Sequence, residues 1–239
     1  MKIYLPDIIK SDGSLNLEEL PNNRKTKFIS ITGQNGSGKT NLRDGLAKYL
    51  SYEGNIVITA ESPCDKHLVK LLNNAIGQNE YKDWYTEQMV FNLADGLLSN
   101  YMIQIKEHCD YFICQRGPID QYASGLVRSG KTYSEIFNIQ CPNNLAKFDM
   151  YIHLNCNADV AWKRVCNDEE KSKYESLEYF YKQEEKNKEL FEEITSGNQK
   201  ELEIFRSSYN VYIDTTNMVI PEVFVHALEH VKNYFRTIK

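Results

Sequence analysis

An apolar segment that leads into a glycine-rich turn constrains this chain more than any other feature. Residues 27–40 read KFISITGQNGSGKT, and residues 33–40 match G-x-x-x-x-G-K-[ST] at every fixed position. In this pattern a buried strand precedes a turn whose backbone N–H groups face inward, and a helix begins at the lysine. The order predicts a strand, a phosphate-binding loop and a helix that starts near Lys39.

The motif predicts how individual residues of this loop bind a nucleotide. We expect Lys39 to reach the β- and γ-phosphates and the hydroxyl of Thr40 to bind Mg²⁺. The glycines permit backbone angles and close approaches that a Cβ would block. The alternative is a glycine-rich turn that only joins a strand to a helix. The predicted nucleotide-binding set is Gly33, Asn35, Gly36, Ser37, Gly38, Lys39, Thr40 and Asn41.

Further apolar segments predict strands that alternate with helices. Strands are expected in residues 55–63, 111–114 and 209–214, and residues 149–165 predict a strand, a turn and a helix capped near Asn157. Other helices are expected over residues 65–76, 85–108, 169–194 and from 221 onward. This alternation predicts one parallel sheet with helices on both faces and ligand sites at the carboxyl ends of the strands.

One apolar stripe in the long helix over residues 85–108 predicts core packing. Its members follow each other at intervals of four: Met89, Leu93, Leu97, Tyr101 and Ile105.

Polar residues at two predicted strand ends are site candidates. Glu61 lies in the polar tip of the second strand, and Gln115 and Arg116 directly follow the third. An arginine at a strand end is poorly explained by packing, and a carboxylate there can face a ligand. For Glu61 the alternative is a solvated loop carboxylate.

Length and composition indicate one large α/β domain over residues 27–239, preceded by an N-terminal arm. Residues 1–26 are polar and interrupted by proline and glycine, with at most one helical turn within residues 12–20. The net charge of -5 argues against a strong nucleic-acid surface and favours small anionic ligands. Six scattered cysteines, with neither a transmembrane stretch nor a signal peptide, predict a reduced cytoplasmic protein without membrane contact.

A phosphate loop alone does not separate kinases from motors and guanine-nucleotide switches. Those classes would call for an aspartate at the end of an apolar strand, and guanine binders also for an N-K-x-D segment. Here YFIC is followed by Gln115 rather than by an aspartate, and N-K-x-D does not occur.

From residue 27 to 238 the chain resembles the thymidylate kinase family and its nucleoside and nucleotide kinase relatives. The segments that carry the resemblance are GQNGSGKTN, TAESP, MVFNLAD, QRGPIDQYASG, YIHLNCNADVAWKRV, KYESLEYF and YNVYIDTT. The resemblance implies a three-layer α/β/α P-loop NTPase fold with a five-stranded parallel sheet and a helical lid. It also implies ATP and Mg²⁺ as cofactors and leaves a homodimer possible.

The resemblance also implies roles for individual residues. Phe91 would stack on the acceptor base, Arg116 would clamp a phosphate, and Glu61 would contact the acceptor. Tyr122 and Asp95 fall in the matching substrate segments, Gln115 on the metal side, and Arg164, Lys171 and Lys173 in the lid region. Three positions depart from the family pattern. Gln115 replaces an aspartate, Ala60 an arginine, and Asp95 an arginine that would hold the acceptor phosphate.

The expected function is transfer of the ATP γ-phosphate to a nucleoside monophosphate, with Lys39, Arg116 and Glu61 as the catalytic set. Two alternatives remain open. One is a deoxynucleoside kinase that uses Glu61 as its base, because a hydroxyl acceptor needs one. The other is a nucleotide-binding regulatory protein that has lost catalysis, for which Gln115 is the main argument.

Overall fold

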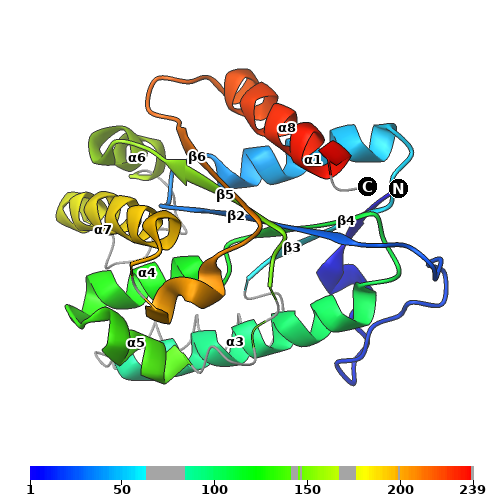
Figure 1. The fold of residues 1–239 in the computed structure, drawn as a ribbon, viewed down its shortest axis with the longest axis horizontal. Helices are drawn as coiled ribbons and strands as arrows, with labels where there is room; N and C mark the ends of the chain where they lie inside the picture. Colours follow the sequence, from blue (N-terminus) through cyan, green and yellow to red (C-terminus); the bar gives the residue numbers. More distant parts are fainter. Residues whose placement is uncertain (63–83, 141–144, 146, 167–175, 199, 238–239) are drawn as a thin grey trace.

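The protein folds around one six-stranded parallel sheet in the order β1-β3-β4-β2-β5-β6 (Figure 1). The computed structural model describes residues 1–62, 84–140, 145, 147–166, 176–198 and 200–237. The strands are β1 (Lys2–Tyr4), β2 (Lys27–Gly33), β3 (Val57–Glu61), β4 (Tyr111–Gln115), β5 (Met150–Asn155) and β6 (Tyr209–Asp214). The predicted α/β fold is confirmed, with six strands where five were expected. The helix expected over residues 65–76 lies outside the described residues.

The sixth strand comes from the N-terminal arm. β1 pairs in parallel with the edge strand β3, placing Lys2 opposite Val57. A short 3-10 helix, η1 (Leu5–Ile8), follows, and Leu5 is fully buried in the core. The helical turn considered within residues 12–20 does not form. The carboxylate of Asp12 instead accepts hydrogen bonds from the backbone and hydroxyl of Ser14, a local turn that competes with helix.

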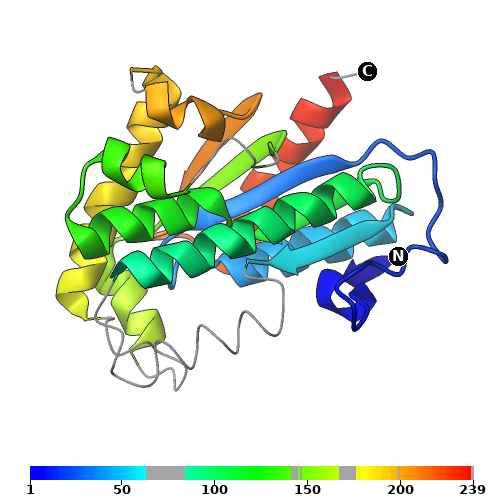
Figure 2. The same ribbon diagram turned by 90° about the horizontal axis from the view of Figure 1, so that it is seen from below.

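Helices cover both faces of the sheet and create two cores (Figures 1 and 2). On one face, α1 and α8 pack against β2 through residues such as Leu46 and Val231. On the other face, α3, α4 and α7 pack through Tyr101, Tyr122 and Leu190. The helices are α1 (Lys39–Tyr52), α3 (Trp84–Ile105), α4 (Pro118–Ser129), α5 (Tyr133–Gln140), α6 (Ala158–Val165), α7 (Leu177–Ser196) and α8 (Ile220–Thr237), with the 3-10 helix η3 (Lys200–Phe205).

The buried side of α3 differs from the predicted stripe. Tyr101 and Ile105 are buried as expected, but Met89 is 46% exposed and Leu93 is 54% exposed. Residues spaced four apart are rotated by about 40° relative to one another around the helix axis. The two ends of such a row therefore face different directions. The core side instead runs through Ala94, Leu98, Tyr101, Met102 and Ile105.

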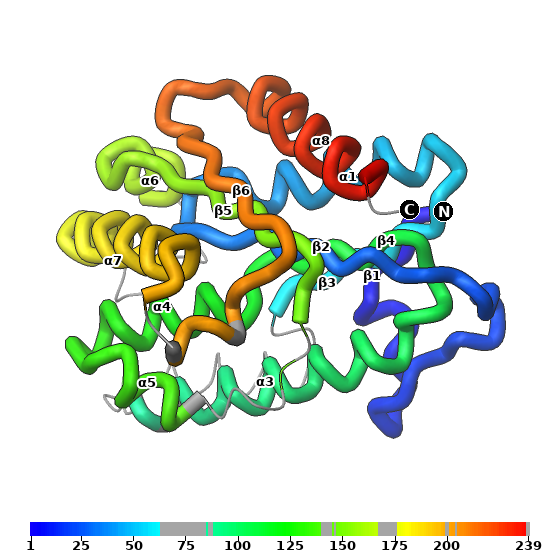
Figure 3. Tube along the Cα trace, viewed as in Figure 1, coloured from blue at the N-terminus to red at the C-terminus, as the bar shows by residue number. Residues whose placement is uncertain are grey.

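The strand register brings three strand ends to one edge of the sheet. β4 lies between β3 and β2, and Gln115 pairs with Glu61 on one side and Ile31 on the other. The path from β2 into α1 and from β4 into α4 can be followed along the same edge in Figure 3. Because the carboxyl ends of parallel strands face ligands in open α/β sheets, this edge is the expected place for the site.

The described cysteines are free thiols: Cys109, Cys114, Cys156 and Cys166. Burial raises the pKa of the Cys109 thiol to about 12. Within the described ranges, none of the helices has both the length and the apolar character that crossing a membrane requires.

Candidate active site

The phosphate loop depends on its glycines for shape. Gly33 has φ 130° and Gly36 has φ 76°, in the region that side chains disfavour. A Cβ on Gly33 would lie 2.0 Å from the Leu154 carbonyl oxygen, and one on Gly36 would lie 2.6 Å from that of Ala161. The loop is therefore pressed against β5 and α6, which fixes its backbone.

Lys39 lies at the start of α1 and folds back over the loop. Its ammonium donates to the carbonyl oxygens of Gly33 at 2.7 Å and Gln34 at 2.8 Å, and the residue is 5% exposed. This position puts a buried positive charge at the base of the loop, as the sequence predicted.

Some of the remaining loop residues form hydrogen bonds with other parts of the protein, and others are exposed to solvent. The Ser37 carbonyl accepts a hydrogen bond from the Thr215 hydroxyl at 3.1 Å, and the side chain of Asn35 accepts one from Arg116 at 3.2 Å. Thr40 and Asn41, in the first turn of α1, are exposed. Their contacts with Mg²⁺ and nucleotide stay predictions.

Glu61 is the centre of a charged cluster at the end of β3. Its Oε1 lies 3.3 Å from Arg116 Nη1 and accepts from Gln115 Nε2 at 3.2 Å, while its Oε2 accepts from Arg43 Nη1 at 3.5 Å. The structure thus brings the predicted residues Glu61, Gln115 and Arg116 together. Both carboxylate oxygens have donors and the side chain is 33% exposed, so the carboxylate is held at the end of β3 while part of it stays open to solvent.

Arg116 is held in an unusual backbone conformation. Its φ is 63°, a left-handed angle that costs a residue with a Cβ on the order of 1–3 kcal/mol and tends to occur at functional sites. Its guanidinium is 39% exposed and contacts both Glu61 and Asn35. The strand end therefore presents this cation toward the phosphate loop with part of it open to a ligand.

Two charged residues of the site were not predicted from the sequence. Arg43, one helical turn after Lys39 on α1, links Glu61 to Asp44. Asp120, in the first turn of α4, accepts a hydrogen bond from Gly33 N at 2.8 Å. Burial raises the pKa of Asp120 to about 6, although Lys39 and Arg116 act in the opposite direction. For Arg43 the i,i+4 spacing from Lys39 could have indicated its direction.

The other three predicted substrate residues, Phe91, Asp95 and Tyr122, have different environments. Phe91 is half-buried on α3, so its stacking role stays a prediction. Asp95 is fully buried, and burial together with its carboxylate raises the pKa of Tyr151. Tyr122 is also fully buried, where its hydroxyl donates to the Tyr133 carbonyl oxygen at 2.6 Å. A substrate contact at Tyr122 stays a prediction that this burial does not favour.

Two buried glutamines between α3 and α4 were also missed. Gln121 donates through Nε2 to the Ser62 hydroxyl at 2.9 Å, and its Oε1 has no hydrogen-bond partner among the described residues. Gln88 is 2% exposed, and its Nε2 has no partner in the same described ranges. A Cβ on Gly125 would lie 2.7 Å from Gln88 Oε1, so α3 and α4 are in close contact here. Buried amide groups of this kind can recognise a polar ligand edge.

Of the three predicted lid cations, the structure describes Arg164, near the end of α6. It donates to the Gly36 carbonyl oxygen at 3.0 Å and to that of Thr215 at 3.3 Å. Asn157 caps the same helix by accepting from Asp159 N. Arg164 is thus in direct contact with the phosphate loop. Lys171 and Lys173 lie outside the described residues.

The oxygen atoms at this edge suit a hard cation. Among the described residues no three His, Cys, Asp or Glu side chains form a metal-binding group. In the described part of the chain, suitable oxygens include that of exposed Thr40 and two buried atoms without hydrogen-bond partners, Gln115 Oε1 and Asp120 Oδ2. Mg²⁺ prefers oxygen ligands and is usually bound by few protein groups together with substrate phosphates and water, so these residues fit it.

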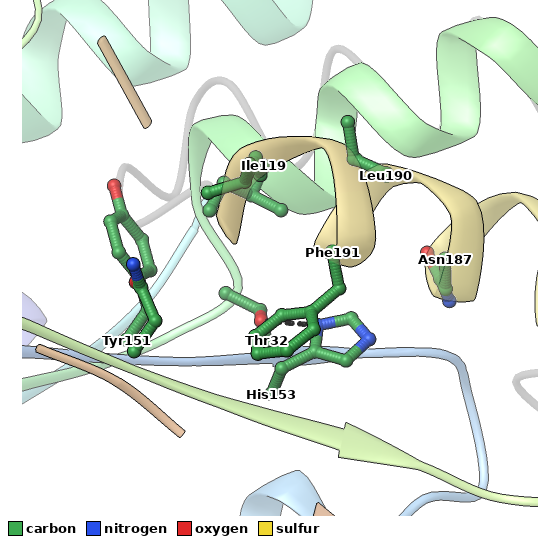
Figure 4. Close-up of a pocket in the computed structure, with 9 residues that line it drawn as sticks. Thr32, Ile119, Tyr151, His153, Asn187, Leu190 and Phe191 are labelled. Atoms are coloured by element: carbon green, nitrogen blue, oxygen red, sulfur yellow. Dashed lines mark hydrogen bonds between the residues drawn. The ribbon is translucent and has the colours of Figure 1, made fainter. Parts of the chain in front are cut away.

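A cavity on the α7 side of the sheet is separate from the charged cluster (Figure 4). It is lined by Thr32, Ile119, Tyr151, His153, Asn187, Leu190, Phe191, Ile194 and Asn210. His153 Nδ1 and the Thr32 hydroxyl form a 2.9 Å hydrogen bond. Burial, with the charge of Lys39, lowers the pKa of His153 to about 3, so this histidine is neutral at neutral pH. The apolar lining indicates packing rather than phosphate binding.

Comparisons with known proteins agree with this geometry. Residues 31–213 match the family model described as thymidylate kinase. A thymidylate kinase from Candida albicans, whose structure was reported to reveal the origin of its broad substrate specificity, is similar with a TM-score of 0.68. The two chains are 18% identical, and the similarity covers 88% of this chain and 92% of that one. No curated protein sequence matches. At 18% identity the structural likeness supports the fold alone. The match to the family model is separate evidence, and it spans more than half of the chain.

Proposed function

The chain belongs to the thymidylate kinase family, and we propose that it transfers the γ-phosphate of ATP to a nucleoside monophosphate held over the ends of β3 and β4. Members of this family are ATP-dependent nucleoside monophosphate kinases, and the protein is a nucleotide kinase of this type. The observation that carries the choice of acceptor is the arrangement of Glu61 between Arg43 and Arg116.

Arg116 is the residue that we assign to the phosphates. A guanidinium offers several N–H donors in a fixed plane and binds phosphate in a bidentate manner. The contacts with Glu61 at 3.3 Å and with Asn35 at 3.2 Å orient this plane before a ligand arrives. Arg43 supplies a second positive charge on the same carboxylate, which offsets the arginines that the family pattern would place at residues 60 and 95.

Glu61 acts as an anchor in this proposal. An acceptor phosphate is already largely ionised at neutral pH, since its second pKa is about 6, so it needs no protein base. A nucleoside hydroxyl would need one. Taking up a proton as that base would neutralise Glu61 and weaken its interactions with Arg43 and Arg116, which carries a free-energy cost.

Catalysis would depend on positioning and on neutralising charge. Lys39 would move from the two loop carbonyls to the phosphates of ATP, and the loop N–H groups would hold the same phosphates. Thr40 and Gln115 provide oxygens for Mg²⁺, which when bound neutralises charge on the phosphates. Arg164 would hold the loop in place through Gly36.

The acceptor base would lie between α3 and α4. Phe91 offers an aromatic face for stacking. The amide atoms Gln88 Nε2 and Gln121 Oε1, which have no partners among the described residues, offer a donor and an acceptor. Donor and acceptor atoms together match the edge of a nucleobase.

A homodimer also belongs to the proposal. α3 exposes an apolar row of Tyr85, Met89 and Leu93, with exposed fractions of 47%, 46% and 54%. Exposed apolar rows often mark contact surfaces. Light scattering of the purified protein measures the oligomeric state directly.

The substitution Glu61→Gln separates this proposal from the two alternatives. For a monophosphate acceptor we expect the acceptor KM to rise, because Arg116 loses its anchor, and kcat to stay within several-fold. For a hydroxyl acceptor with Glu61 as base, kcat would fall by about 10²–10⁴-fold. Glu107→Gln, at an exposed position, is the matched control. A wild-type protein that binds ATP and transfers phosphate to neither acceptor would favour the regulatory alternative.

A further inference from the structure

Asp120 contacts the first residue of the phosphate loop, Gly33. The backbone bends at Arg116, and after the extended Gly117 the helix α4 opens at Pro118. This bend places Asp120 in the first helical turn, where its Oδ1 accepts from Gly33 N at 2.8 Å across 87 residues of sequence. One oxygen of the carboxylate is thereby fixed against the loop.

The second oxygen of Asp120 has no such partner. Oδ2 is buried and makes no hydrogen bond in the described part of the chain. A buried acceptor without a donor costs on the order of 1–3 kcal/mol, and more when the group is charged. Its charged neighbours are Lys39 and Arg116, the two cations assigned to phosphate. The carboxylate therefore lies within the phosphate-binding part of the site.

The other acidic group at this edge is already engaged. Both oxygens of Glu61 interact with arginine or amide donors, and β4 ends in the neutral Gln115. Phosphate-loop enzymes use a strand-end carboxylate to hold Mg²⁺ beside the phosphates. Gln115 Oε1 is buried and has no hydrogen-bond partner within the residues that the structure describes, so an amide oxygen and a carboxylate oxygen both lack partners there.

We propose that Asp120 supplies the carboxylate for the nucleotide-bound Mg²⁺, accepting hydrogen bonds from its hydration shell while Gln115 contributes a neutral oxygen. The inference rests on the proposed function. Mg²⁺ keeps several waters in protein sites, and a carboxylate anchored on Gly33 would orient them rather than replace them. Asp120 is then a positioning residue for the cation, and the loss of the strand-end carboxylate at Gln115 does not imply the loss of catalysis.

Asp120→Asn tests this assignment because asparagine keeps an oxygen for Gly33 N and removes the charge. Mn²⁺ binding in the presence of ADP can be followed by the electron paramagnetic resonance of free Mn²⁺. Groups that orient a metal's surroundings typically contribute 10–100-fold in affinity, so we expect Mn²⁺ binding to weaken at least about tenfold. ADP affinity measured in EDTA should stay unchanged or improve, because a negative charge near the phosphates is removed. Asp159→Asn, also in the first turn of a helix, is the matched control.

The outcomes separate the inference from the proposed function. If the wild type binds neither ADP nor Mn²⁺ with ADP, the proposed function fails. If it binds both and Asp120→Asn binds Mn²⁺ within twofold of the wild type, the inference alone fails. Equal losses of ADP affinity in EDTA and of Mn²⁺ affinity would also overturn it, since they indicate a purely structural anchor.

Gln115→Asp provides a second test if Asp120→Asn does not fold. A second carboxylate beside Asp120 should tighten Mn²⁺ binding with ADP by at least about threefold, because ligand charge strengthens binding of hard cations. Unchanged Mn²⁺ affinity in a folded Gln115→Asp protein would contradict the assignment of this edge to the cation.

Discussion

Glu61 and Arg116 lie at the ends of neighbouring strands with 3.3 Å between Oε1 and Nη1. Arg116 adopts a left-handed backbone angle, and its guanidinium also donates to Asn35 of the phosphate loop. This pair joins the loop to the side of the site where we place the acceptor. Its geometry leads to predictions for the residues around it.

Lys39→Ala should lower turnover by several orders of magnitude with little effect on the fold. The ammonium is a buried positive charge on the loop, and fixed charges in such sites stabilise the negative charge that develops in phosphoryl transfer. Steady-state kinetics together with a thermal melt measure both effects. Lys48→Ala, exposed on the same helix, serves as the control. Near-normal turnover in folded Lys39→Ala would remove the loop from the mechanism.

Arg116→Lys should be nearly as damaging as Arg116→Ala. A lysine carries the charge but cannot make the two parallel hydrogen bonds of a guanidinium, nor hold Glu61 and Asn35 at once. We expect kcat/KM for the acceptor to fall by a similar factor in both variants, with Arg236→Lys, exposed near the end of α8, as the control. Full activity of Arg116→Lys would mean that a single positive charge is enough to bind the phosphate, and would contradict the bidentate role of Arg116.

His153→Gln should make stability less sensitive to acid. The pKa of His153 is about 3 in the folded protein against an ordinary value of 6.5, so the unfolded chain binds a proton that the folded protein excludes. Stability is then lost as pH falls below about 6.5, by about 2 kcal/mol between pH 7 and pH 5 for this residue. Urea unfolding at pH 5, 6 and 7 should show a smaller decline for His153→Gln than for wild type. The exposed variant His226→Gln should behave as wild type, and equal declines in all three proteins would refute the assignment.

The sequence predicted the features that depend on local pattern. The strand and helix around the glycine-lysine motif, the strands that lead to Glu61 and Gln115, and the helix cap at Asn157 all depend on neighbours in sequence. The structure confirms these elements, with strand ends that differ by one or two residues from those expected. The prediction that Met89 and Leu93 pack in the core was wrong, because residues spaced four apart rotate gradually around the helix axis. The strand β1 was missed because three residues carry little periodicity.

The site residues that were not predicted from the sequence depend on contacts between segments that are distant along the chain. Asp120 meets Gly33 across 87 residues, and Arg43 meets Glu61 across 18. A sequence pattern gives the helix on which each residue lies, but only the packing of α4 and α1 against the strand ends determines what they contact. Burial decides the pKa of Asp120 in the same way, since it follows from the elements packed around the carboxylate.

Phosphorus-31 nuclear magnetic resonance of the phosphate products tests the central claim most directly. Wild-type protein is incubated with ATP, Mg²⁺ and a panel of nucleosides and nucleoside monophosphates, with Lys39→Ala as the blank. We predict that one or more monophosphate signals decrease as ATP is consumed, with two nucleoside diphosphates formed for each ATP (ADP from the donor and one from the acceptor), while nucleosides give no new monophosphate. New monophosphate from a nucleoside, with no diphosphate from any monophosphate acceptor, would contradict the assignment of Arg116 and Glu61 to an acceptor phosphate.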